Sequence, residues 1–361
     1  MMVGWASDPS KIARESRPTG ARREPVKTDR APPQGRGRRT QVERVRFRIA
    51  GYLACCLLSA PPVRAGEGQE LRLPVVRDTW FSAVGEEADC NLGGASRLKV
   101  KSIQEMSLVD LDPAPLKGHV VRKAALHFRL AGDEILKRVT VGSFSSDWVE
   151  GTADRYQPQA GSSTFHHQKH PSVPWAQAGS DLTAVMLGQG GSLWASYDAV
   201  PPDAQGWQAV PVDPKIVAAR IADISYGFLV FDDTGTEWTR KGEEFILRLF
   251  PNRFVHSRQS RPDSAPYFTV TLGPADTDPP AEPEELGGDA KALPAGEADV
   301  SWRTPYDRGE AGTMGFFVEV DGRQVPRYLV PAAGRPGERI SMRLRDLRLS
   351  PGATVTVSVR A

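Results

Sequence analysis

Short runs of alternating apolar and polar residues, separated by turn-forming residues, constrain the fold of this chain more than any other feature. They span residues 71–76, 97–101, 124–130, 138–144, 224–231, 245–250 and 267–272. Alternation with a period of two predicts strands that bury one face, and only one short helix, over Pro214–Ile221, is expected. We therefore expect an all-β protein, with a jelly-roll-like β-sandwich over residues 70–273.

The charge of the chain is unevenly distributed. Residues 1–65 contain 14 basic and five acidic residues, a net charge of +9. The whole chain has a formal charge of +2, which leaves −7 for residues 66–361. An acidic folded part argues against nucleic acid as a partner.

The N-terminal residues have the pattern of a secretory signal. Residues 1–45 are expected to be a disordered basic extension, and we interpret residues 1–40 as upstream of the true start, near Val42 or Val45. A basic flank, a short apolar stretch and Ala65 follow, which predicts a signal peptide over residues 46–65 and a secreted or cell-surface protein without stable membrane insertion after cleavage. The alternatives are a buried helix, a nucleic-acid-binding arm and, at Cys55, a lipoprotein cleavage site. Cleavage after Ala65 leaves Cys90 as the lone cysteine, so no internal disulfide is expected.

Four ordered motifs carry a family resemblance. They are Asp78-Thr79-Trp80-Phe81-Ser82 with Asn91-Leu92-Gly93-Gly94, Val121-Arg122-Lys123-Ala124-Ala125-Leu126-His127-Phe128, Asp147-Trp148-Val149-Glu150-Gly151-Thr152, and Phe254-Val255-His256-Ser257-Arg258 with Pro266-Tyr267-Phe268-Thr269-Val270. With them, residues 70–273 resemble the bacterial and archaeal DNRLRE domains, which are related to carbohydrate-binding module family 96 and to disaggregatase-type repeats. Leu92 and Gln259 depart from the family pattern, which has an aromatic residue and often an acid there.

The resemblance implies a carbohydrate-binding module. The candidate ligand-binding residues are Trp148, Glu150, Trp175 and Trp194. Trp148 and Glu150 would share a face of a strand, either as a sugar contact or, as we favour, as a packed ring beside an acid that binds loop amides. Trp175 and Trp194 have Pro, Gly or Ser near them, so we expect these two rings to be exposed.

Two candidate metal sites follow from the side chains. Asp78 and Asn91 have side-chain oxygens that could bind a structural Ca²⁺. We favour the interpretation that Asn91 belongs to a turn and that Asp78 is an acid at a strand edge. The long polar loop that follows contains His166, His167 and His170. Zinc binding there is disfavoured, because the HExxH pattern is absent and adjacent histidines cannot easily both bind one ion.

No catalytic motif is present, so an enzyme is not expected. The sequence has no Gly-x-Ser-x-Gly elbow, phosphate-binding loop or dinucleotide fingerprint. The paired acids Asp232 and Asp233 are adjacent, so on a strand they would point to opposite faces.

The C-terminal part resembles a fibronectin type III domain. An acidic, Pro-rich linker is expected over residues 274–285. The resemblance covers residues 286–361 and rests on three segments: 298–305 with Trp302, 315–320, and 346–361 with a Leu-x-Pro-Gly-like turn. Trp302 is expected in the core. A seventh strand would follow Ala361, so we expect an incomplete immunoglobulin-like sandwich in a longer protein.

The predicted function is a secreted, non-catalytic module that binds a polysaccharide or cell-surface glycan, as a monomer within a longer chain, with the fibronectin-like domain as spacer. The alternatives are a structural or adhesive surface protein without sugar binding, and a fragment of a polysaccharide-degrading enzyme. Exposed tryptophans on one face would favour the first, a featureless polar surface the second, and clustered carboxylates in a cleft the third.

Overall fold

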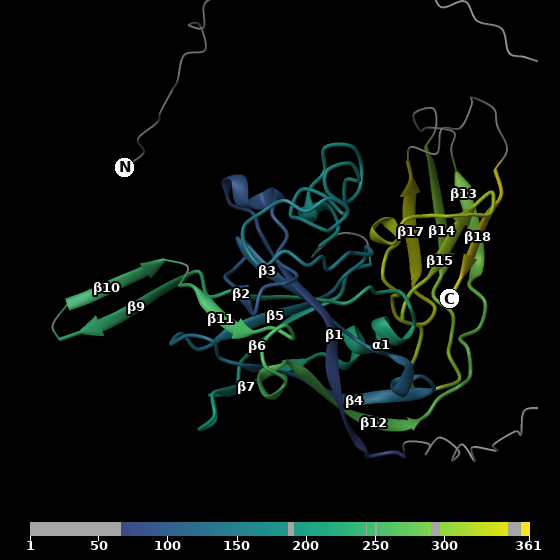
Figure 1. Ribbon diagram of the computed structural model, residues 1–361. Helices are drawn as coiled ribbons and strands as arrows, with labels where there is room; N and C mark the ends of the chain where they lie inside the picture. The colour runs from purple at the N-terminus through teal and green to yellow at the C-terminus, as the bar shows by residue number, and fades with distance from the viewer. Residues whose placement is uncertain (1–65, 187–190, 243, 250, 290–296, 346–354) are drawn as a thin grey trace, which may run out of the picture. The chain divides into compact units, whose positions relative to one another are not determined.

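The fold is built from antiparallel strands. A computed structural model describes residues 66–186, 191–242, 244–249, 251–289, 297–345 and 355–361. Over these residues the chain forms strands, short 3-10 turns and one α-helix, α1 (Pro214–Ile221). The predicted all-β sandwich class is confirmed, and α1 has the predicted bounds (Figure 1). Asp213 caps α1 by accepting a hydrogen bond from the Lys215 amide, and Pro214 occupies the first turn, where no amide donor is needed.

The larger sandwich has two sheets that share one long strand, β1 (Glu70–Ser82). The open sheet contains the first part of β1, then β12 (Tyr267–Ala275), β4 (His119–Arg129) and β7 (Trp207–Val212). The covered sheet contains the rest of β1, then β3 (Glu105–Leu111), β8 (Phe228–Asp232), β5 (Arg138–Ser143) and β6 (Trp194–Asp198). The pairing register shifts between Val75 and Arg77, where β1 passes from one sheet to the other.

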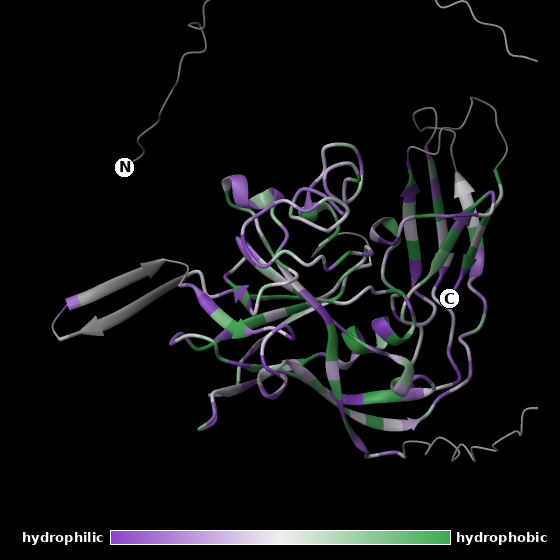
Figure 2. Cartoon of the chain, in the orientation of Figure 1, coloured by the Kyte–Doolittle hydropathy of each residue, from purple (hydrophilic) through white to green (hydrophobic). Residues whose placement is uncertain are grey.

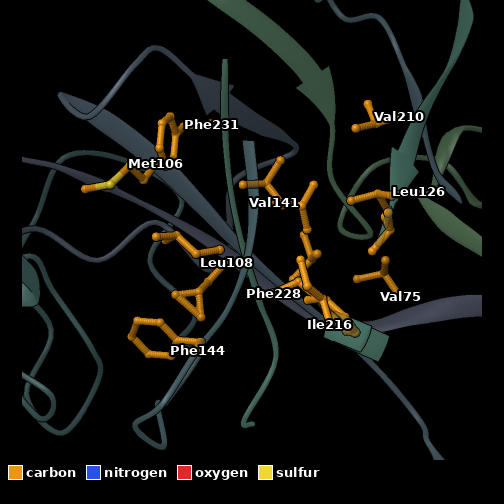
Figure 3. Close-up of a cluster of buried hydrophobic side chains, with 14 of the residues drawn as sticks. Val75, Met106, Leu108, Leu126, Val141, Phe144, Val210, Ile216, Phe228 and Phe231 are labelled. Atoms are coloured by element: carbon orange, nitrogen blue, oxygen red, sulfur yellow. The ribbon is translucent and has the colours of Figure 1, made fainter. Parts of the chain in front are cut away.

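The core lies between these two sheets. Figure 3 shows Leu126 and Val210 of the open sheet opposite Val141 and Phe228 of the covered sheet. Ile216 of α1 belongs to the same buried cluster. Apolar residues of both sheets therefore meet in one core, as a two-layer sandwich requires.

The two sheets differ on their outer faces. Along β12, Phe268, Val270 and Leu272 are buried and the residues between them are half-buried, an alternation that can be followed in Figure 2. By contrast, every residue of β3 is buried. The open sheet thus has one face toward solvent, whereas β3 in the covered sheet is enclosed on both sides and only the edge strand β6 of that sheet is largely exposed.

Smaller elements complete this part of the chain. β2 (Arg97–Val100) pairs with β11 (Arg253–His256), and β9 (Thr236–Lys241) pairs with β10 (Glu244–Leu249) in a hairpin. The 3-10 turns over Gly85–Asp89, Ala114–Leu116, Leu182–Ala184 and Pro262–Ser264 lie in the connections. The predicted strand over 224–231 is displaced, because the ladder begins only at Phe228 and runs to Asp232.

The C-terminal sandwich has a core of its own. One sheet contains β13 (Glu284–Asp289), β14 (Ala298–Arg303) and β17 (Arg339–Leu344), and the other contains β16 (Arg323–Gln324), β15 (Phe317–Val320) and β18 (Val357–Arg360). A 3-10 turn spans Arg327–Leu329. Trp302 is fully buried, with its ring 5.2 Å from that of Phe316, so its prediction as a core residue is confirmed.

Several predictions fall at or beyond the limits of the described residues. The predicted N-terminal extension, the signal peptide and the Leu-x-Pro-Gly-like turn over 347–352 lie outside them. β12 continues to Ala275 and β13 begins at Glu284, so both strands extend into the segment that we expected to be linker. Over the part of the chain that the structure describes, no helix is long and apolar enough to cross a bilayer.

Candidate functional site

Aromatic side chains gather on the outer face of the open sheet. Tyr267 of β12, His127 of β4 and Trp207 of β7 occupy outward positions, because the residues next to each of them in sequence point into the core. Tyr267 lies directly opposite His127 in the register. Three strands that are distant in sequence thus bring three rings to one surface.

The rings contact one another in a defined geometry. The His127 ring stacks on Tyr267, with 4.5 Å between ring centroids and 4° between ring planes. The Trp207 ring meets Tyr267 at 61°, with 5.2 Å between centroids. These separations fall within the range in which aromatic pairs attract, so each ring restricts the movement of its neighbour.

Polar groups border the rings. The guanidinium carbon of Arg72, on β1, lies 3.7 Å from the Tyr267 ring centroid, which is a cation–π contact. His127 Nε2 lies 2.9 Å from the hydroxyl oxygen of Thr269. We call Arg72, His127, Trp207, Tyr267 and Thr269 the aromatic face. It combines apolar ring surface with hydrogen-bonding groups at its edges, which is the composition of many ligand-binding surfaces.

The charge state of His127 follows from its surroundings. Burial lowers the pKa of His127 below the ordinary value of 6.5, and the nearby Arg72 cation lowers it further, whereas Glu70 opposes the shift. The imidazole is therefore neutral at pH 7. In that form it offers one hydrogen-bond donor and one acceptor.

The lowered pKa predicts a pH-dependent stability. The unfolded chain takes up a proton at His127 more readily than the folded chain, so this contribution is complete above about pH 6.5 and declines on acidification. We expect His127→Gln to show a smaller loss of stability than wild type between about pH 7.5 and about pH 5. Urea unfolding at the two pH values measures this difference. The pKa of His256 is also lowered, so only the difference between the proteins tests the assignment; equal losses would contradict it.

Trp148 and Glu150 have structural contacts. Trp148 is buried and its Nε1 donates to the Tyr226 carbonyl at 2.8 Å, so the ring packs, as the favoured interpretation expected. Glu150 forms a two-pronged ion pair with Arg258, at 2.6 and 2.7 Å, and accepts a hydrogen bond from the Asp78 amide at 2.8 Å. Glu150 therefore joins β1 to the segment after β11.

The expected exposure of the two loop tryptophans is confirmed for one and wrong for the other. Trp194, on β6, is 57% exposed. Trp175 is only 3% exposed, because its ring packs edge-on against Phe81 and Phe144 at 5.9 and 5.5 Å. The loop that carries Trp175 covers the outer face of the covered sheet, so this ring belongs to the core and is out of reach of a ligand.

The predicted calcium ligands lie close to Glu150. Asn91 donates to the carbonyls of Glu150 and Ser163 at 2.8 and 3.0 Å, and its Oδ1 accepts from the Gly93 amide. Asp78 Oδ2 accepts from the Arg258 amide at 2.7 Å, and burial raises the pKa of Asp78 to about 7. The contacts of Asn91 are those of the favoured turn interpretation. A Ca²⁺ ion at this pair stays a prediction.

The aromatic face was not among the predicted sites. Arg72, His127, Tyr267 and Thr269 lie in predicted strands, but Trp207 lies in β7, a strand that was not predicted. Tyr267 opens the run 267–272, and His127 lies within the run 124–130. The aromatic residues at these positions could be seen in the sequence. The strand register that places Tyr267 opposite His127 could not be predicted from it.

Comparisons with known proteins give little further information. No protein-family model matches the chain, and no curated protein matches it. One match among solved structures is to the structure of the Macrobrachium rosenbergii nodavirus, at 9% identity and a TM-score of 0.18, covering 85% of this chain and 89% of that one.

Proposed function

We propose that this protein binds a glycan through the aromatic face. The observation that carries the proposal is the contiguous set of Tyr267, Trp207 and His127 rings on the open sheet. A sugar ring has an apolar face of C–H groups and a rim of hydroxyls. Aromatic rings bury the first, and the donors and acceptors at their edges bind the second. The resemblance to DNRLRE domains supports the same function.

The sheet geometry favours an extended ligand. The aromatic face crosses β1, β12, β4 and β7, and neighbouring strands are about 4.8 Å apart. Ring contacts distributed over several strands suit a chain of sugar units better than a single monosaccharide. We therefore propose polysaccharide or cell-surface glycan as the ligand and a secreted, non-catalytic role, with the C-terminal sandwich as a spacer.

The test is the binding of the full chain to a panel of neutral and acidic polysaccharides by affinity electrophoresis. We expect retardation by at least one polysaccharide, and we expect Tyr267→Ala and Trp207→Ala to weaken it about tenfold or more, because Trp207 supplies ring surface and Tyr267 holds the His127 and Trp207 rings in place. Thr271→Ala is the matched control, since Thr271 is a half-buried β12 residue beyond the aromatic face; it should bind like wild type.

Other outcomes assign other functions. If Trp194→Ala abolishes binding and Tyr267→Ala does not, the ligand binds at the edge strand β6. If folded protein binds no polysaccharide, the structural or adhesive alternative replaces this proposal. Circular dichroism of each variant separates a lost contact from a lost fold. Repeating the assay with a chelator tests the predicted Ca²⁺ at Asp78 and Asn91.

A further inference from the structure

Three histidines and one acid meet on the surface of the larger sandwich, apart from the aromatic face. Asp89 ends the 3-10 turn Gly85–Asp89, and His166, His167 and His170 lie in the long loop. The loop is attached to the turn, since the His166 amide donates to the Ala88 carbonyl at 3.3 Å.

Backbone hydrogen bonds fix the loop around these side chains. The His167 amide donates to the Thr164 hydroxyl at 3.1 Å, and the Thr164 amide donates to the His167 carbonyl at 2.9 Å. The His170 amide donates to the Ser162 carbonyl at 2.8 Å. The imidazoles of His167 and His170 are therefore positioned by the fold of the loop, as a preformed ligand site requires.

The ligand atoms have the separations of a metal site. Asp89 Oδ1 lies 3.4 Å from His167 Nδ1 and 3.8 Å from His170 Nδ1. The ligand atoms of these three residues all lie within 4.8 Å of one another. Tetrahedral zinc with bonds of about 2.0–2.1 Å places its ligand atoms about 3.4 Å apart. Small movements of the side chains would therefore suffice for coordination.

The two imidazole nitrogens also lack other partners. His167 Nδ1 and His170 Nδ1 are buried, and neither has a hydrogen-bond partner among the residues that the structure describes. Buried polar atoms are normally paired, and each unpaired one is unfavourable. A cation bound between these nitrogens and the Asp89 carboxylate would satisfy both atoms.

We propose that Asp89, His167 and His170 bind one Zn²⁺ ion. Two imidazole nitrogens and one carboxylate oxygen suit zinc, whereas Ca²⁺ and Mg²⁺ prefer oxygen ligands throughout. His166 Nδ1 lies 3.1 Å from Asp89 Oδ1 and orients that carboxylate. The site does not need adjacent histidines to share the ion, because His167 and His170 are three residues apart. The ion would join the turn to the loop that covers the sheet.

The experiment titrates Zn²⁺ into the chelator-stripped full chain in competition with a chromophoric chelator. We expect one ion per chain and a higher melting temperature on binding. The double variant with His167→Ala and His170→Ala should bind about a hundredfold more weakly or worse and lose the thermal shift. His256→Ala is the control, since it removes a histidine outside this cluster and should bind like wild type.

Substitution with Co²⁺ gives a readout that does not depend on any variant folding. Wild type should show the intense visible absorption of a four-coordinate ion with nitrogen ligands, and Zn²⁺ should displace it. Weak octahedral absorption, or equal zinc binding by wild type and the double variant, would overturn the proposal. Loss of zinc binding with glycan binding intact would confirm that the two sites are separate.

Discussion

Replacing Trp175 with alanine should lower the free energy of unfolding by about 3–5 kcal/mol. The ring is 3% exposed and packs edge-on against Phe81 and Phe144. Its Nε1 also donates to the carbonyls of Thr164 and Phe165, both at 3.0 Å. The substitution would leave a large cavity between the loop and the covered sheet and would remove the Nε1 donor from the Thr164 carbonyl, whereas the Phe165 carbonyl would keep the Leu182 amide as a donor at 2.8 Å. Urea unfolding of the purified full chain measures the effect.

Trp194→Ala is the matched control for this prediction. It removes the same side chain from an exposed position on β6, so its effect on stability should stay within about 0.5 kcal/mol. Equal losses of stability in the two variants would contradict the burial of Trp175. A change in glycan binding in Trp194→Ala alone would show that the exposed ring contacts the ligand.

This pair of tryptophans shows where sequence patterns stop being informative. Both have turn-forming residues nearby, and local composition predicted exposure for both. Trp175 is buried because Phe81 of β1 and Phe144, which follows β5, form a surface that the loop covers. Those contacts join residues far apart in sequence, so no local pattern could distinguish Trp175 from Trp194.

Burial of one face accounts for some of the strands that were predicted. The strands of the open sheet have one face in the core, so β4 and β12 show the period of two. β3 is buried on both faces, and its alternation of polar and apolar residues breaks once, where Leu108 and Val109 are adjacent. Burial does not decide the outcome alone, since β5 is buried from Val139 onward and was predicted, whereas β7 alternates and was not.

The family-like motifs were informative about contacts but not about roles. Asp78 and Asn91 were candidates for an ion and Glu150 for a sugar contact, although structural roles were the favoured interpretation for all three. The structure unites them, since both the amide of Asp78 and the side chain of Asn91 donate to Glu150. Gly93 is required beside them, because a Cβ atom there would lie 1.9 Å from the Glu150 carbonyl oxygen. These contacts connect three segments of the larger sandwich, which explains the motifs without a ligand.

The adjacent acids Asp232 and Asp233 give the second large expected effect. Asp232 is 0% exposed and its Oδ2 lies 3.3 Å from Nε of Arg253, which is 1% exposed. Asp233 instead pairs with Arg138 at 3.5 Å. Asp232 also accepts hydrogen bonds from the amides of Lys137 and Thr234, at 2.7 and 3.0 Å. Asp232 is thus a buried carboxylate that faces a buried guanidinium.

Asp232→Ala should therefore lower the free energy of unfolding by about 3–5 kcal/mol, because it removes the charge opposite buried Arg253 and the acceptor of two amides. Asp198→Ala, at an exposed acid on β6, is the control and should change stability by less than about 0.5 kcal/mol. In urea unfolding, the double variant with Arg253→Met should lose less than the sum of the single variants, because the two side chains contact each other and each single variant already removes that contact. Strict additivity, or a loss below about 1 kcal/mol for Asp232→Ala, would mean that the pair is solvated and that β8 and β11 are held together by apolar contacts alone.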